Sequence, residues 1–257
     1  MARRFIDISV PLNNTAVADM PGSSPKITYN THEDATGLLA GFPGLKIEDL
    51  PDGQAWAAES ITLNTHSGTH VDAPWHYHPT MNNGEPAWKI DEVPLEWCFQ
   101  RGVKLDFRHL PDGHVCSAAE VEAELKRIGH ELQPLDIVVA NTGAGGHYGE
   151  ADYMSRGCGF GAEATLWLTG KGVRVVGTDG WSWDAPFIHT RKRWEATRDP
   201  SIIWEGHKAG RHCGYCQIEK LANLEALPAD GFMISCFPFK IERASAGWTR
   251  AVAIFED

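Results

Sequence analysis

Several features that mark other classes of protein are absent from this sequence. Its 257 residues contain no apolar run long enough to cross a membrane. Its 23 Lys and Arg are outnumbered by 34 Asp and Glu, and the net charge of −11 disfavours binding to nucleic acid or anionic lipid. Its 6 cysteines are too few for a disulfide scaffold of this length, and no apolar segment follows the basic start as in a signal peptide. We therefore expect a cytoplasmic protein that binds neither membranes nor nucleic acids.

The composition is that of a folded α/β protein. Apolar residues make up 42% of the chain and charged residues 22%, which is ordinary globular usage. Ser117 and Glu120 form a capping box that opens a helix, and Gly129 stops it. Helices are predicted at 117–128 and 161–170, and strands at 4–12, 56–64, 103–107, 137–141, 173–178, 232–241 and 249–255.

This order of elements favours a mixed sheet with flanking helices, in which the last two strands pair. No linker or repeat divides the chain, so residues 1–257 are expected to form a single domain. Residues 20–53 are rich in Gly, Pro, Asn and Asp and predict a long irregular excursion. Such an excursion could close over a pocket of its own subunit or of a partner subunit.

The most informative segment holds four histidines and one aspartate within 13 positions, from His66 to His78. A helix is disfavoured there by Gly68 and Pro74. In an extended chain, alternate side chains share a face, so His66, His70, Asp72 and His76 would lie together, with a turn near Pro74. His78 has the same parity but follows Pro74, and we expect it to lie behind the site or on the surface.

Two imidazoles and a carboxylate are ligands for a first-row transition metal, so His66, His70 and Asp72 are predicted to hold Mn²⁺ or Zn²⁺. Three protein ligands leave coordination positions open for water and substrate, as in hydrolytic sites. His76 has a suitable pKa for the acid/base or is a ligand of a second ion. Aromatic residues near this segment and farther along the chain, Trp75, Trp181 and Trp183, are predicted to line a pocket for a flat aryl substrate.

The string from His66 to His76, His-Ser-Gly-Thr-His-Val-Asp-Ala-Pro-Trp-His, resembles the HxGTHxDxPxH motif of the cyclase-like metal-dependent hydrolases. That family includes bacterial kynurenine formamidases and isatin hydrolases. Segments 177–184 and 244–252 are similar to further family segments, as are Glu205-Gly-His207 and Gln217-Ile-Glu219.

The resemblance implies a barrel-like mixed sheet of the swivelling β/β/α type and a homodimer or higher homo-oligomer. It implies one metal ion at His66, His70 and Asp72, and a second, where present, at Asp72, His207 and Glu219. His207 and Glu219 would then also serve catalysis, with Glu219 as the second candidate base. Gln217 leaves the register open by two residues, and with it the choice between one ion and two.

These residues together predict a metal-dependent amidohydrolase of a non-peptide C–N bond, which opens a cyclic aryl amide such as isatin through a metal-activated water. Three alternatives stay open within the same site: an arylformamidase acting on N-formylkynurenine, a lactone hydrolase or cyclase, and a non-heme Fe(II) oxygenase. A non-catalytic dimeric scaffold that retains a metal is a further alternative. The sequence contains no GxSxG elbow, which disfavours a serine hydrolase, and the lone Cys213-x-x-Cys216 pair is taken as structural.

Overall fold

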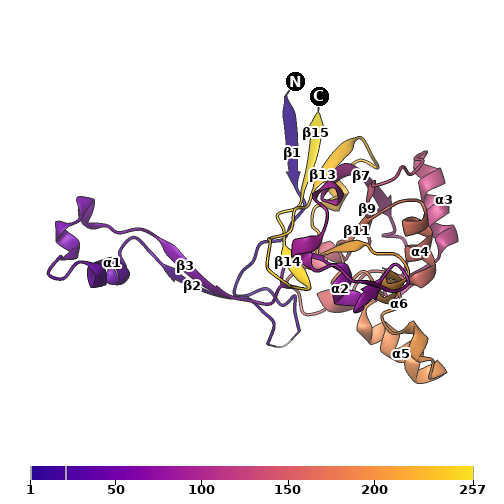
Figure 1. Cartoon of the computed structure of the whole chain (residues 1–257), viewed down its shortest axis with the longest axis horizontal. Coiled ribbons are helices and arrows are strands. Elements are labelled where there is room, and N and C mark those ends of the chain that lie inside the picture. Colours follow the sequence, from indigo (N-terminus) through magenta and orange to yellow (C-terminus); the bar gives the residue numbers. More distant parts are fainter. Residues whose placement is uncertain (1, 21, 257) are drawn as a thin grey trace.

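The computed structural model describes residues 2–20 and 22–256; Met1, Pro21 and Asp257, which the domain and excursion predictions include, lie outside the described residues. Within this part of the chain, nine strands form a curled mixed sheet in the order β1-β15-β13-β7-β9-β11-β12-β4-β14 (Figure 1). The strands are β1 (Arg3–Asp7), β4 (His70–Asp72), β7 (Phe99–Asp106), β9 (Ile137–Asn141), β11 (Val175–Thr178), β12 (Cys216–Glu219), β13 (Phe232–Ser235), β14 (Ala246–Trp248) and β15 (Val252–Glu256).

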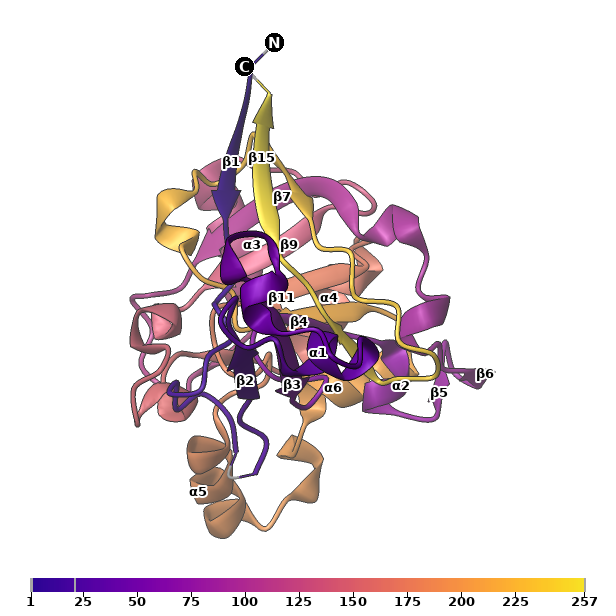
Figure 2. The same ribbon diagram turned by 90° about the vertical axis from the view of Figure 1, so that its left-hand side faces the viewer.

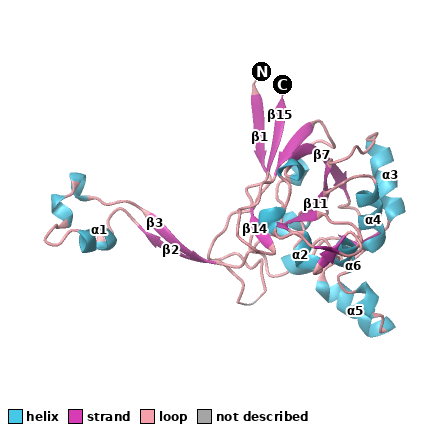
Figure 3. Ribbon diagram, viewed as in Figure 1, coloured by secondary structure: helices cyan, strands magenta, loops and turns pink. Residues whose placement is uncertain are grey.

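The centre of the sheet is parallel and both edges are antiparallel. Strands β7, β9, β11 and β12 run in one direction, and β13 and β4 reverse it on either side. Most of the helices flank the sheet (Figure 3). They are α1 (Thr36–Gly41), α2 (Pro74–Tyr77), α3 (Ala118–Ile128), α4 (Ala162–Gly170), α5 (Phe187–Thr197) and α6 (Glu205–Lys208). Shorter strands pair apart from the main sheet: β2 (Lys26–Asn30), β3 (Ala58–Thr62), β5 (Thr80–Met81), β6 (Glu85–Pro86), β8 (Val115–Cys116) and β10 (Gly159–Phe160).

Two apolar clusters bury the two faces of the sheet. Alternate residues of β9 enter different clusters: Ile137 and Val139 join one, and Val138 and Ala140 join the other. The second cluster also takes Val121 and Leu125 of α3 and Ala164 and Leu168 of α4. Because β9 is buried on both sides, its sequence is a continuous apolar run rather than an alternating one.

The predicted mixed α/β sheet is confirmed, although the sequence did not predict helix α5 or strands β12 and β14, and several element ends differ. Helix α3 begins after Ser117, whose hydroxyl accepts from the Glu120 amide, and it ends at Gly129 in the left-handed region, as predicted. The two strands predicted last, now β13 and β15, pair antiparallel as expected, although β14 lies between them in the chain. The first strand stops at Asp7 instead of residue 12, because the Asp7 carboxylate accepts from the Ser9 amide and turns the chain. No helix in the described residues is both long and apolar enough to cross a membrane.

The segment predicted to be irregular is a structured arm. Strands β2 and β3 form an antiparallel hairpin ladder from Lys26 paired with Thr62 to Asn30 paired with Ala58, and α1 lies beyond its far end. Figure 1 shows this arm leaving the body of the molecule, and Figure 2 shows it end-on in front of the sheet. The arm therefore does not fold back over its own subunit; only its base, near Met20 and Ser23, borders the predicted site.

Candidate metal centre

Neighbouring antiparallel strands supply the central residues of the site. His70 and Asp72 are alternate residues of β4, so their side chains share one face, as the extended-chain argument predicts. Strand β12 pairs with β4 so that Glu219 lies opposite His70 and Gln217 lies opposite Asp72. The Glu219 carboxylate faces the histidines, whereas the Gln217 amide donates to the Tyr215 hydroxyl. Of the two residues, Glu219 is thus the one whose carboxylate lies within 3.6 Å of the histidine nitrogens.

His66 and His76 reach the same place by a different backbone path from the one predicted. The expectation of a continuous extended segment is wrong, because Gly68 adopts φ 62° and breaks the chain into a turn before β4. A Cβ at Gly68 would lie 2.6 Å from Leu12, so the turn requires glycine. Pro74 then opens the one-turn helix α2, as expected for proline at the first helical position, and α2 carries His76.

His207, the residue implied only by resemblance, joins the cluster from α6. Its Nδ1 lies 2.5 Å from Asp184 Oδ2, and Asp184 also accepts from the backbone amides of Gly206 and His207. This contact holds the ring so that Nε2 points toward Asp72 and Glu219. Trp204 stacks on the His207 ring with centroids 4.7 Å apart, which fixes the imidazole plane from one side.

The ligand atoms converge on the two oxygens of Asp72. Asp72 Oδ1 lies 2.8 Å from His66 Nδ1 and 3.3 Å from His70 Nε2. Asp72 Oδ2 lies 3.9 Å from Nε2 of both His76 and His207. Glu219 bridges the two sides, with Oε2 3.5 Å from His70 Nε2 and Oε1 3.6 Å from His207 Nε2.

The cluster has the properties of a cation site. His70 and Asp72 are fully buried, yet His70 Nε2 and both Asp72 oxygens have no partner in hydrogen-bond geometry among the described residues, although His66 Nδ1 lies 2.8 Å from Asp72 Oδ1. Leaving such groups unsatisfied in the interior costs free energy unless a ligand or ion meets them. The Nδ1 of His70 lies 2.8 Å from the Gly68 carbonyl, which leaves Nε2 free to act as a ligand. A divalent cation would satisfy these atoms, so the residues present fit a metal. Two sets of ligand atoms lie close enough together to hold one, His66 with Asp72 and His76, and His70 with Asp72 and Glu219, so the predicted set of His66, His70 and Asp72 is divided between them.

The electrostatics agree with this assignment. Burial by itself raises the pKa of Asp72, but the charges of His76, His66 and His70 hold that pKa well below its usual range. Burial by itself lowers the pKa of His70, but the charge of Asp72 outweighs this effect and raises that pKa to about 9. Without a metal, the cluster therefore attracts positive charge. Burial also lowers the pKa of His76 to about 4, and this imidazole is therefore neutral near pH 7, as a ligand or a base must be.

A cavity of about 170 Å³ opens beside the cluster. His66, His76 and Glu219 border it on the cluster side, and Trp181 borders it as predicted for a substrate pocket. Trp75 does not line this cavity; its side chain is 43% exposed. The predicted role of the Trp183 side chain is wrong, because it is 1% exposed and stacks on Phe160 in the core. Its backbone amide, however, donates to Glu219 Oε1 at 3.0 Å and so holds a site residue.

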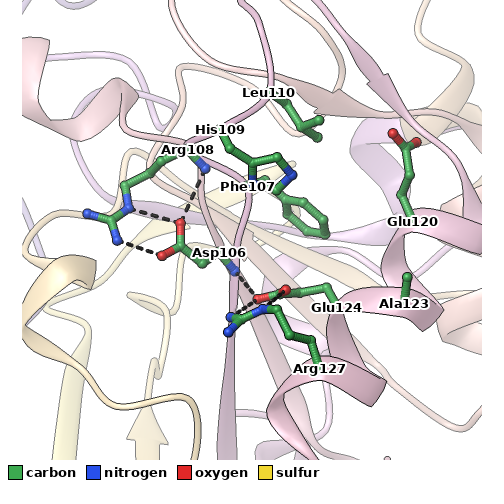
Figure 4. A pocket seen from close by; sticks show the side chains of 9 residues that line it. All are labelled: Asp106, Phe107, Arg108, His109, Leu110, Glu120, Ala123, Glu124 and Arg127. Atoms are coloured by element: carbon green, nitrogen blue, oxygen red, sulfur yellow. Dashed lines mark hydrogen bonds and ion pairs between the residues drawn. The ribbon is translucent and has the colours of Figure 1, made fainter.

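A wider pocket at the ends of β7 and α3, shown in Figure 4, is not the site. Its charged groups already have partners: Arg108 is paired with Asp106, Arg127 with Glu124, and Glu120 with His114 outside the pocket. Because these side chains already have partners, no charged group in this ion-pair network is left to recognise a ligand.

Sequence reasoning passed over two residues that support the cluster, Asp184 and Trp204. Asp184 lies in the quoted Trp-Ser-Trp-Asp segment, and that segment was the available signal. Trp204 lies three positions before His207. Its role depends on a left-handed backbone conformation, φ 55°, that no local sequence pattern predicts.

Replacing Asp184 by Asn tests the support of His207. The variant removes the acceptor that orients His207 Nδ1, so we expect metal affinity to fall about 10- to 100-fold, as for other groups that orient a metal-binding histidine. Calorimetric titration with Mn²⁺ and Zn²⁺ measures this loss. Asp199→Asn is the matched control, because Asp199 caps an exposed turn at Ser201. Equal affinities for the two variants would show that Asp184 has no such role.

Known proteins with this fold include isatin hydrolases. Isatin hydrolase A from Ralstonia solanacearum has a TM-score of 0.77 and 22% identity, covering 99% of this chain and 92% of that one. Isatin hydrolase A from Labrenzia aggregata, bound to benzyl benzoate, has a TM-score of 0.75 and 20% identity, covering 99% and 94%. At these identities the likeness concerns the fold.

Sequence comparison gives a shorter but independent match. The kynurenine formamidase of Bacillus thuringiensis subsp. konkukian is 29% identical over 90 residues, and that of Bacillus cytotoxicus is 30% identical over 90 residues. The chain spans about a third of the length of these curated relatives, 32% and 34% respectively. A model of the Cyclase family ("Putative cyclase") matches residues 6–185, which include His66, His70, Asp72 and His76. The chain belongs to the Cyclase family.

Proposed function

We propose that this protein is a metal-dependent hydrolase that opens a cyclic aryl amide such as isatin. The observation that carries the proposal is the buried Asp72, whose two unsatisfied oxygens are surrounded by four histidine nitrogens and Glu219. His66, Asp72 and His76 form one set of close ligand atoms and His70, Asp72 and Glu219 another, so these residues would hold one Mn²⁺ or Zn²⁺ ion or two. When bound, the metal lowers the pKa of a water molecule and polarises the substrate carbonyl.

The chain's own residues prepare the rest of the reaction. Asp184 and the Gly68 carbonyl fix the rings of His207 and His70. The Trp183 amide fixes Glu219. His76 borders the cavity with a neutral Nε2, and where it is not itself a metal ligand it takes a proton from the attacking water and returns it to the leaving nitrogen. Glu219 is the alternative base, since it also borders the cavity.

The cavity favours a flat aromatic substrate. The Trp181 indole borders it, and the imidazoles of His66 and His76, 4.2 Å apart between centroids, form a second set of ring faces. An aryl amide can pack against such surfaces, whereas an aliphatic peptide gains less from them. The kynurenine formamidase relatives support an arylformamidase as the second candidate, with N-formylkynurenine as substrate.

The arm supports a homodimer. Helix α1 has no buried residue, and Tyr29, Phe42 and Trp56 on the arm are 58%, 58% and 60% exposed. An isolated two-stranded hairpin is only marginally stable in water, and large exposed aromatic residues mark interaction surfaces. A second copy of the chain is the proposed partner that covers them.

The decisive experiment compares isatin and N-formylkynurenine as substrates of protein reconstituted with Mn²⁺ or Zn²⁺, followed by ultraviolet absorbance. We expect ring opening of isatin to be the faster reaction, to stop on chelation and to return when metal is added back. Turnover must persist without O₂, because hydrolysis consumes only water, whereas an Fe(II) oxygenase would fail. Faster cleavage of N-formylkynurenine would replace the lactam reaction by the formamidase reaction. A protein that binds metal but turns over neither substrate, nor other cyclic amides and lactones, would contradict the proposal.

A further inference from the structure

A buried lysine beside the cluster has no part in the chemistry derived above. Lys220 follows Glu219 and is 2% exposed. Its φ of 57° lies in the left-handed region, which residues other than glycine seldom adopt. In a continuing strand, Lys220 and Glu219 would point to opposite faces, but here both border the same cavity. The conformation is held on both sides: the Lys220 amide donates to the Gly180 carbonyl at 3.0 Å, and its carbonyl accepts from Thr69 Oγ1 at 2.6 Å.

The ammonium of Lys220 connects two segments that are far apart in sequence. Its Nζ donates to the backbone carbonyl of His66 at 2.7 Å and to the Asp19 carboxylate. Asp19 belongs to residues 16–20, here called the strap. Ala18 of the strap is buried against Ala144 and Tyr153, and Met20 borders the cavity. One ammonium at the end of β12 therefore contacts two segments: the turn that carries His66 and the strap that borders the cavity.

We propose that Lys220 is a positioning residue that holds His66 in place for metal binding and, through Asp19, holds the strap in place for substrate binding. The metal part of this inference rests on the proposed function. A buried ion pair costs desolvation and by itself adds little to stability compared with apolar residues of the same size. Its role here is to fix positions. The charged Lys220 donor binds the His66 carbonyl and the Asp19 carboxylate and so holds both segments in place relative to Glu219.

Three variants separate positioning from plain stability: Lys220→Met, Asp19→Asn and the double variant. Each is titrated with Mn²⁺ by calorimetry, and its Tm is recorded without metal. Lys220→Met should weaken Mn²⁺ binding about 10- to 100-fold, as loss of a group that orients a ligand does. Asp19→Asn keeps the Lys220 contact to His66, so its Mn²⁺ affinity should match that of the wild type while KM for the aryl substrate rises. Lys240→Met, an exposed lysine, is the control for loss of one positive charge.

The double variant is the critical test. It removes the buried carboxylate that Lys220→Met leaves unpaired, so its Tm should recover while its Mn²⁺ affinity stays low. Lys220→Arg, which keeps the charge and the donors, should restore most of the affinity. If the double variant regains both Tm and affinity, or if Lys220→Met lowers Tm alone, the residue is only structural and the inference is wrong. Absence of Mn²⁺ and Zn²⁺ binding in the wild type would instead contradict the proposed function.

Discussion

Asp72→Asn should abolish tight metal binding and turnover while leaving the protein folded. The amide has nearly the size of the carboxylate but lacks its charge, and Asp72 is the residue on which the nitrogens of His66, His70, His76 and His207 converge. A direct ligand should matter more than a residue that only orients one, so we expect a loss of affinity beyond about 100-fold. Titration with Mn²⁺ and Zn²⁺ and the rate of aryl amide hydrolysis measure the two effects.

His78→Ala is the matched control within the same histidine-rich segment. His78 points elsewhere, with its Nδ1 3.0 Å from Thr80 Oγ1. We expect this variant to bind metal and to turn over substrate within about 2-fold of the wild type, as surface substitutions away from special features usually do. Circular dichroism should show the same fold for both variants. Retention of metal by Asp72→Asn at wild-type affinity would refute the assignment of the site.

Removal of the arm should convert a dimer into a monomer. Residues 27–61 can be replaced by an Asn-Gly turn that joins Lys26 to Thr62, because these two residues pair across the β2–β3 ladder. The deleted part carries Tyr29, Phe42 and Trp56, the exposed aromatic residues assigned above to the contact between copies. Light scattering coupled to size-exclusion chromatography should then give the mass of one shortened chain, whereas we expect the mass of two chains for the wild type.

A subtler variant controls for the deletion. Changing Tyr29, Phe42 and Trp56 together to Ser keeps the arm but removes its aromatic surface, and it should weaken the dimer in the same direction. The nine-stranded sheet lies outside the deleted residues, so the Tm of the body should change little. A mass of two chains after deletion would place the dimer contact elsewhere, and a monomeric wild type would exclude the proposed role of the arm.

The sequence by itself determined the class of fold and indicated four residues of the candidate metal cluster, His66, His70, Asp72 and His76. Continuous apolar runs such as 137–141 can only be buried on both faces of a sheet, and a capping box with a terminal glycine defines a helix, so both were predicted nearly to the residue. Histidine and aspartate at 66, 70, 72 and 76 indicated metal chemistry because several imidazoles and a carboxylate grouped together are typical ligands of a transition metal. These are local properties of short stretches of chain.

Only the tertiary structure decided how the site is assembled and enclosed. Gly68 in the left-handed region broke the extended segment that parity suggested, whereas the turn near Pro74 was predicted and is the short helix α2. The choice of Glu219 over Gln217 depends on the register of β12 against β4, which is set by packing across the whole sheet. Asp184, Trp204, Asp19 and Lys220 act through contacts between distant segments. Such contacts form only when the whole sheet is assembled, and no local periodicity of the sequence predicts them.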